Sequence, residues 1–171
     1  GRPVEWKPVL LGVVFKAAGS APLTSLYEPK ARYSIRDFSR SAQHAGVPYK
    51  HPSQFPIGSV AAKRAVLWLQ QNKPELATPF IHAVFRAFFV DDRDISNAEV
   101  VGDIAQQLGI DRNELAAGIQ QPEIKEKLKT QVDQAVANGI FGAPTIIVDG
   151  ELFWGNDRLP QVERWLERGP F

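Results

Sequence analysis

The chain has 171 residues, of which 44% are hydrophobic and 23% charged, with a formal net charge of +1. This length fits one domain, or one domain with a large insertion, and is sufficient to bury a sizeable core. The near-zero charge gives no electrostatic support for binding to nucleic acid or to an anionic membrane. No apolar run approaches the roughly 20 residues that span a bilayer, so no membrane span is predicted.

Residue types that support redox and metal chemistry are scarce. The sequence has no cysteine and three histidines, His44, His51 and His82. Without cysteine these residues form no disulfide, thiolate metal site or dithiol redox centre. The histidines lack the spacing of metal ligands, so no metal site is predicted.

The N-terminal part is expected to contain a strand and a short helix. Trp6 and the β-branched valines favour a strand over 4–10, which Pro8 limits to an edge or to the end of a strand. A short apolar helix is expected over 12–18, ended by Gly19.

Helical periodicity dominates the middle of the chain. Helices are expected over 31–45, over 59–70 with Ser59 as cap, from Pro74 onwards with Pro79 inside, and over 122–138. Three prolines between 46 and 58 predict a rigid irregular loop.

Two further helices are expected to open at N-terminal capping patterns. These patterns are Ser96-x-x-Glu99 and Asp111-x-x-Glu114, in which the first side chain accepts a hydrogen bond from a backbone N–H of the first turn.

The C-terminal part returns to strands. Residues 143–148 (APTIIV) read as a short apolar strand, and Asp149-Gly150 is a strong signal for a two-residue hairpin turn. A partner strand over 151–154 and a final helix follow. A lone N-terminal strand needs this hairpin beside it, so the helices between must form a separate layer or subdomain of an α/β fold.

Three segments resemble kappa-class glutathione transferases. Residues 8–16 (PVLLGVVFK) resemble the segment after the second strand, 141–145 (FGAPT) the cis-proline turn, and 154–159 (WGNDRL) the motif that opens the last helix. The form GNDR is associated with bacterial 2-hydroxychromene-2-carboxylate isomerases. The resemblance covers essentially the whole chain and implies a thioredoxin-like sheet with a large all-helical insertion.

The resemblance also implies domain boundaries. Residues 1–30 and 139–171 would form the thioredoxin-like part and 31–138 the helical insertion, with the alternative that the last inserted helix belongs to the thioredoxin-like part. The first strand–helix unit of the family would precede Gly1, in a chain that begins without methionine. Since that unit carries the catalytic serine of the family, no residue of this sequence is assigned as catalytic.

Two segments carry the predicted glutathione contacts. A cis-proline at the start of a strand would leave the N–H and C=O of Ala143 outside the ladder, where an extended peptide can pair with them. The alternative for Pro144 is a plain strand-initiating proline. By resemblance Asn156 and Asp157 contact the γ-glutamyl group of glutathione, and the alternative is that they cap the last helix.

Three more glutathione contacts are predicted by resemblance. Lys30 and Tyr33 occupy the start of a helix, with a solvated lysine and a half-buried tyrosine as the alternative. Ser20 takes the place of an asparagine of the family, and its hydroxyl can still donate one hydrogen bond.

Aromatic side chains are candidates to line a substrate pocket. They are Trp154, Phe15 and the cluster 85–89, although their periodicity fits core packing better.

The resemblance implies a cytoplasmic homodimer that uses glutathione to isomerise a small aromatic substrate. A serine hydroxyl and a helix N-terminus would stabilise the thiolate, which adds to the conjugated substrate and leaves again. Two alternatives remain open. One is a DsbA-like thiol-disulfide oxidoreductase or a general kappa-type transferase, and the oxidoreductase is disfavoured by the GNDR motif. The other is a non-catalytic thioredoxin-like binding module, disfavoured because its sheet would expose a central edge.

Overall fold

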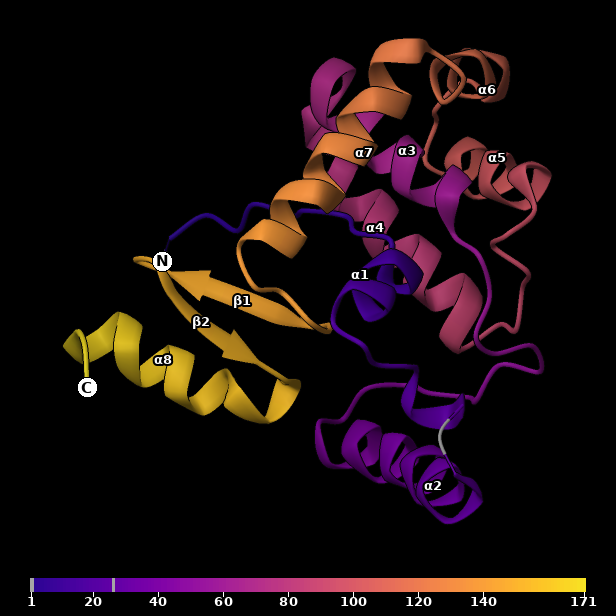
Figure 1. Ribbon diagram of the computed structural model, residues 1–171. Coiled ribbons are helices and arrows are strands. Elements are labelled where there is room, and N and C mark those ends of the chain that lie inside the picture. Colours follow the sequence, from indigo (N-terminus) through magenta and orange to yellow (C-terminus); the bar gives the residue numbers. More distant parts are fainter. Residues whose placement is uncertain (1, 26) are drawn as a thin grey trace.

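A computed structural model describes residues 2–25 and 27–171 and shows a mostly helical chain with one β-hairpin near its C-terminus (Figure 1). The elements in chain order are α1 (Leu11–Ala17), η1 (Leu23–Ser25), α2 (Glu28–His44), α3 (Val60–Asn72), α4 (Pro74–Phe89), α5 (Ala98–Gln107), α6 (Arg112–Gly118), α7 (Pro122–Ala137), β1 (Thr145–Val148), β2 (Glu151–Trp154), η2 (Asn156–Arg158) and α8 (Leu159–Arg168). None of the helices in the described part is both long and apolar enough to cross a membrane.

The predicted helices are confirmed to within a few residues, with prolines at the start of α2, α4 and α7. Proline suits the first turn of a helix because its missing N–H has no partner there. Pro79 lies inside α4 without ending it. Ser59 occupies the N-cap position of α3, but its hydroxyl accepts a hydrogen bond from the Lys63 ammonium and caps no backbone N–H. The predicted capping role of Ser59 is therefore wrong.

One of the two predicted capping patterns is confirmed. The Asp111 carboxylate accepts a 2.8 Å hydrogen bond from the Glu114 N–H at the start of α6. At α5 the cap is Asn97, whose side chain accepts from the Glu99 N–H at 2.9 Å. Ser96 is not the cap, because its hydroxyl and N–H both donate to the Asp94 carboxylate.

The predicted N-terminal strand is wrong, because residues 2–10 form no regular element. Pro3 and Pro8 have no N–H to donate to a ladder. The carbonyls of Trp6 and Pro8 instead accept side-chain hydrogen bonds from Gln70 of α3 and Gln131 of α7. The sheet of the described residues therefore consists of β1 and β2 alone.

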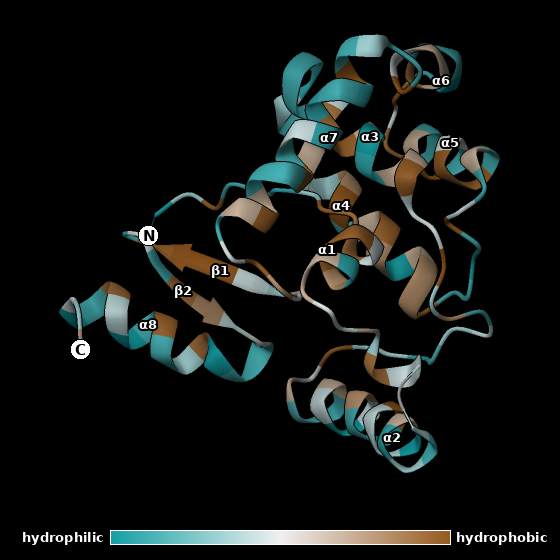
Figure 2. Cartoon of the chain, in the orientation of Figure 1, coloured by the Kyte–Doolittle hydropathy of each residue, from teal (hydrophilic) through white to brown (hydrophobic). Residues whose placement is uncertain are grey.

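The C-terminal hairpin is confirmed. β1 and β2 pair antiparallel, with Thr145 opposite Trp154 and Val148 opposite Glu151. Asp149 and Gly150 both have positive φ, 53° and 88°, as a type I′ turn requires. Figure 2 shows hydrophobic colouring along β1, which fits its apolar sequence.

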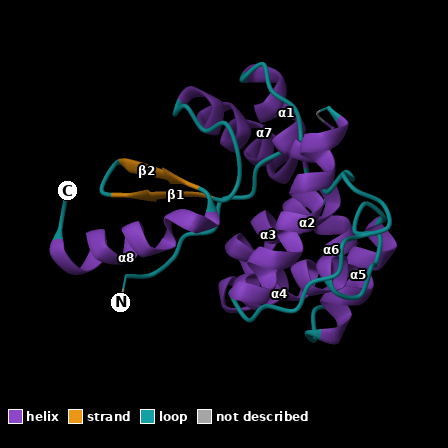
Figure 3. Ribbon diagram, turned by 90° about the horizontal axis from the view of Figure 1, so that it is seen from below, coloured by secondary structure: helices purple, strands orange, loops and turns teal. Residues whose placement is uncertain are grey.

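Buried apolar side chains form two clusters. The larger one is formed by the helices α3, α4, α5, α6 and α7. Its largest fully buried members include Phe80, Leu67, Leu69, Ile104 and Leu115. The smaller one joins one face of the hairpin to α8 through Val148, Phe153 and Val162, with Ile146 and Trp165 packed against it. Figures 1 and 3 show the hairpin and α8 to one side of the remaining helices. The domain boundaries at 30 and 138 stay a prediction.

Candidate functional site

Two of the predicted binding segments meet at one end of the hairpin. Antiparallel pairing places Thr145, the first residue of β1, opposite Trp154, the last residue of β2. The N–H of Gly155 then donates a 3.0 Å hydrogen bond to the carbonyl of Pro144. Residues 141–145 and 154–157, here named the hairpin end, therefore lie together although they are separated in the sequence.

The backbone of Ala143 is available for pairing. Ala143 is exposed, and its peptide bond with Pro144 is cis. Within residues 2–25 and 27–171, neither its N–H nor its C=O makes a backbone hydrogen bond. An extended peptide can pair with such groups in the manner of an added strand.

The alternative that Asn156 and Asp157 cap the last helix is wrong. Both residues lie in η2, and the N-cap of α8 is Arg158, with no side-chain capping hydrogen bond. The side chain of Asp157 is 67% exposed, and its charged neighbour within 4 Å is Arg158, at 3.4 Å. Both polar side chains are thus exposed, in the two residues that follow Gly155, and are not used in capping.

Gly155 is required at this place for two reasons. Its φ of 107° lies in the left-handed region that side chains rarely adopt. A Cβ there would also meet Oδ1 of Asp157, so this exposed carboxylate would have to move. The glycine therefore permits both the hydrogen bond to Pro144 and the position of the Asp157 carboxylate.

An exposed aromatic pair flanks the same backbone. The rings of Phe141 and Trp154 meet edge to face, with centroids 4.9 Å apart, and the two residues are 43% and 47% exposed. The Trp154 indole lies against Gly142, where a Cβ would be 2.5 Å from Nε1. Phe141 was not among the predicted contact residues. The glycine between an aromatic residue and Ala-Pro was the signal that could have indicated it.

Ser20, Lys30 and Tyr33 are not joined to the hairpin end by any hydrogen bond or ion pair of the described residues. The Ser20 N–H donates to the Phe15 carbonyl after α1. The carbonyl of Lys30, an exposed residue in the first turn of α2, accepts a hydrogen bond from the Ser34 hydroxyl.

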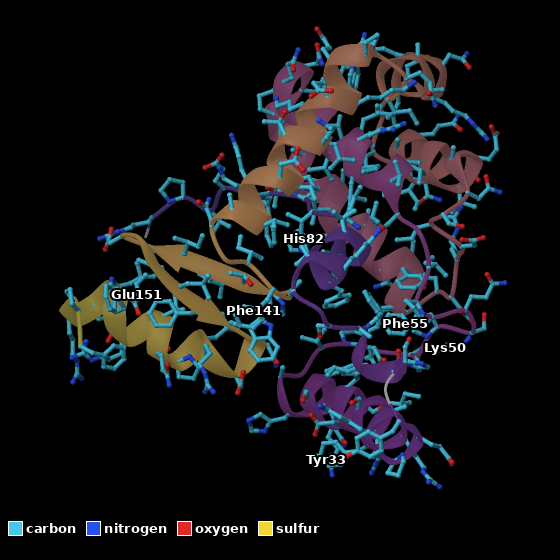
Figure 4. All side chains as sticks on the ribbon, viewed as in Figure 1. Tyr33, Lys50, Phe55, His82, Phe141 and Glu151 are labelled. Carbon is cyan, nitrogen blue, oxygen red and sulfur yellow. The ribbon has the colours of Figure 1, made fainter. Side chains whose placement is uncertain are left out.

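Tyr33 is 60% exposed rather than half-buried, and the Arg40 guanidinium lies 5.2 Å from its ring centroid. Figure 4 shows Tyr33 and Phe141 in separate places. The roles of Ser20, Lys30 and Tyr33 stay predictions.

The other candidate aromatics lie elsewhere. Phe88 is buried in the large cluster, as the core interpretation predicts, whereas Phe85 is 54% exposed. Phe55 packs against Phe88 and His51, and Figure 4 shows it away from Phe141.

The hydroxyl of Tyr49 lies 2.8 Å from Nδ1 of His51, and burial raises the pKa of Tyr49.

The opposite end of the hairpin carries a charged contact. A hydrogen bond from Arg2 and a second from the Trp165 indole lower the pKa of Asp149 in the turn. No group of three or more His, Asp or Glu residues suited to a metal ion occurs in the described part of the chain.

Comparison with known proteins gives a consistent result. Residues 2–167 match the family described as DSBA-like thioredoxin domain. A 2-hydroxychromene-2-carboxylate isomerase of Sphingobium xenophagum is 28% identical over 167 residues, which are 97% of this chain and 84% of that protein. The glutathione S-transferase kappa 2 of Caenorhabditis elegans is 27% identical over 176 residues, covering 96% of this chain and 78% of that protein.

Solved structures support the fold. A 2-hydroxychromene-2-carboxylate isomerase superimposes with a TM-score of 0.85 at 24% identity, over 96% of this chain and 79% of the other. The cytosolic disulfide reductase DsbM of Pseudomonas aeruginosa, solved with GSH, superimposes with a TM-score of 0.58 at 18% identity, over 80% and 69%. The predicted thioredoxin-like fold with a helical insertion is therefore confirmed, and the chain belongs to the DsbA-like thioredoxin domain family.

Proposed function

We propose that this protein is a glutathione-dependent enzyme of the 2-hydroxychromene-2-carboxylate isomerase type and that the hairpin end holds glutathione. The observation that carries the proposal is the hydrogen bond from Gly155 to Pro144. This bond joins the segment that contains Ala143 to the segment that carries the exposed side chains of Asn156 and Asp157. Support also comes from relatives that are named as this isomerase and as a kappa glutathione transferase.

Each part of glutathione has a chemical counterpart at the hairpin end. The N–H and C=O of Ala143 pair with the cysteinyl residue of the peptide, like an added strand. The Asp157 carboxylate takes the ammonium of the γ-glutamyl group in a charge-assisted hydrogen bond. The Asn156 amide and the backbone N–H groups at the start of η2 receive its carboxylate. Lys30, Tyr33 and Ser20 are proposed as further contacts, with Lys30 balancing a negative charge.

In the proposed reaction the cysteinyl thiolate adds to a conjugated carbon of a small aromatic substrate. The C–S bond forms as the electron pair moves to the substrate oxygen. The former double bond then rotates, and the electron pair returns to expel the thiolate. Glutathione is therefore regenerated and acts as a cofactor. We place this activity in the cytoplasm and in a homodimer.

Ligand-dependent stability tests the binding step. Glutathione should raise the melting temperature of the natural full-length protein, because a ligand at 100 times its Kd stabilises the folded state by about 2.7 kcal/mol. An unchanged melting temperature at millimolar glutathione would overturn the proposal. Product analysis then separates isomerase from transferase, since an isomerase leaves the glutathione concentration constant and a transferase converts it into a conjugate.

A matched pair of variants tests the site. Asp157→Ala should weaken glutathione binding by about tenfold or more, since a hydrogen bond to a charged group contributes roughly 1.5–3 kcal/mol. Asp133→Ala makes the same change at an exposed position on α7 and should leave the affinity unchanged. If Asp157→Ala lowers only the melting temperature and not the affinity, Asp157 is not a contact.

A further inference from the structure

The proposed contacts with glutathione do not use the exposed aromatic pair at the hairpin end. Phe141 and Trp154 keep 43% and 47% of their surface exposed, although they pack against each other. Large exposed aromatic rings that are held in place beside polar groups are typical of ligand-binding surfaces.

Trp154 has a fixed position relative to the proposed glutathione contacts. Along the chain it is followed by Gly155, which binds Pro144, and then by Asn156 and Asp157. Across the ladder it lies opposite Thr145, which follows Pro144. Its indole rests against the backbone of Gly142. The backbone of Trp154 and the packing of its indole therefore both connect it to the segments that carry the proposed contacts.

The orientation of the strands directs Trp154 away from α8. Ile146, Val148 and Phe153 face α8 and form the small core. Side chains alternate between the faces of a strand, so Trp154 lies on the opposite face together with Ile147. The Nε1–H of Trp154 also makes no hydrogen bond within residues 2–25 and 27–171, whereas that of Trp165 donates to Asp149.

We infer that Trp154, supported by Phe141, binds the planar aromatic group of the second substrate and determines the specificity of the enzyme for aryl compounds. This inference rests on the proposed function. The aryl group stacks on the exposed indole, and Nε1–H donates to an oxygen of the substrate. The conjugated carbon is thereby held beside the thiol of the peptide that pairs with Ala143.

Ile147 provides the matched control for this inference. It is 50% exposed and shares the face of Trp154, but it pairs with Leu152 next to the turn rather than at the hairpin end. If the face served only for packing against protein, Ile147 would contribute to it as Trp154 does. If Trp154 binds the aryl group, substitution of Trp154 should raise KM for the aryl substrate and substitution of Ile147 should not.

The kinetic experiment uses the natural full-length protein at saturating glutathione, with 2-hydroxychromene-2-carboxylate as the aryl substrate. Trp154→Leu should raise KM for this substrate about three- to tenfold, which is the range expected for the loss of an aromatic pair. Trp154→Phe should retain most of the affinity because it keeps a ring. Ile147→Thr should leave KM unchanged, and the Kd of glutathione should stay within about twofold in all three variants.

A second measurement does not depend on how well Trp154→Leu folds. These 171 residues contain four tryptophans, each of which should give a ¹⁹F resonance when the protein is labelled with 5-fluorotryptophan. Adding the aryl substrate with glutathione should shift the Trp154 resonance, assigned through Trp154→Phe. The resonance of the buried Trp68 should stay in place.

The outcomes separate the two proposals. Wild-type protein that binds no glutathione overturns the proposed function. Wild-type protein that binds glutathione, with a stationary Trp154 resonance or with equal effects of Trp154→Leu and Ile147→Thr on KM, overturns the aryl-binding role alone.

Discussion

The N–H of Gly155 and the carbonyl of Pro144 are joined by a 3.0 Å hydrogen bond that closes the hairpin end beyond the last pair of the ladder. The bond joins the segment of Ala143 to Gly155, the residue that precedes Asn156 and Asp157, and Gly155 has a positive φ of 107°.

Gly155→Ala should therefore affect both stability and binding. The positive φ costs a side chain about 1–3 kcal/mol, and the added Cβ would displace the exposed Asp157 carboxylate. Urea unfolding should show this loss, and glutathione affinity should fall several-fold. Gly139→Ala is the control, because its φ is 74° with no atom within 4 Å of the Cβ. It should lower stability without changing affinity, and equal effects on affinity would contradict this role of Gly155.

A second glycine is critical for the helical core. Gly118 is buried at the end of α6, where a Cβ would overlap the indole of the buried Trp68. Gly118→Ala should lower the free energy of unfolding by about 1–3 kcal/mol, the usual cost of overpacking. Gly12→Ala in α1 has open space and an ordinary φ, so it should change stability by less than about 1 kcal/mol. Similar losses of stability in both variants would mean that the overlap with Trp68 is not the cause of the loss in Gly118→Ala.

The start of α5 gives a test of capping. Asn97→Ala removes the acceptor of the Glu99 N–H and should cost about 1 kcal/mol in chemical denaturation. Ser96→Ala leaves that bond intact and should cost less than half as much. The reverse order would mean that Ser96, the residue indicated by the sequence pattern, is the functional cap.

Asp149 should make stability depend on pH in the acid range. Arg2 and the Trp165 indole lower the pKa of its carboxyl in the folded protein. Its ionised form therefore stabilises the folded state fully above the unfolded pKa of about 3.9. This stabilisation disappears as pH falls through the lower folded pKa. Unfolding free energies measured between pH 5 and pH 2.5 should fall less steeply for Asp149→Asn and for Arg2→Gln than for wild type, and unchanged slopes would contradict the role of Arg2.

Local patterns predicted much of the fold. Apolar residues recurring along α7 and the Asp149-Gly150 turn between two apolar runs each depend on neighbours in sequence, and both elements form as predicted. Asp111 caps α6 for the same reason. The prediction for Ser96 was wrong because its hydroxyl donates to the nearby Asp94 carboxylate instead of capping α5.

Long-range contacts account for what the sequence did not predict. The β-branched residues before α1 favour a strand, but a strand needs a partner, and glutamines of α3 and α7 bind the carbonyls of Trp6 and Pro8. The candidate site was predicted as two separate segments. These segments meet through the hydrogen bond from Gly155 to Pro144 and through the packing of Trp154 on Gly142. Both contacts depend on the pairing register of β1 and β2, which the pattern of residues along the sequence does not determine.

The separation of the two apolar clusters has a consequence for local opening. The small cluster has three buried residues, and the segment 2–10 links it to the larger one through Arg2 at Asp149 and through Gln70 and Gln131. Such a small unit opens at lower free energy than the whole molecule, so its amides exchange with solvent sooner. The amides of the β1–β2 ladder should therefore respond to the proposed binding of glutathione at the hairpin end, while those of α3 and α4 should report global unfolding.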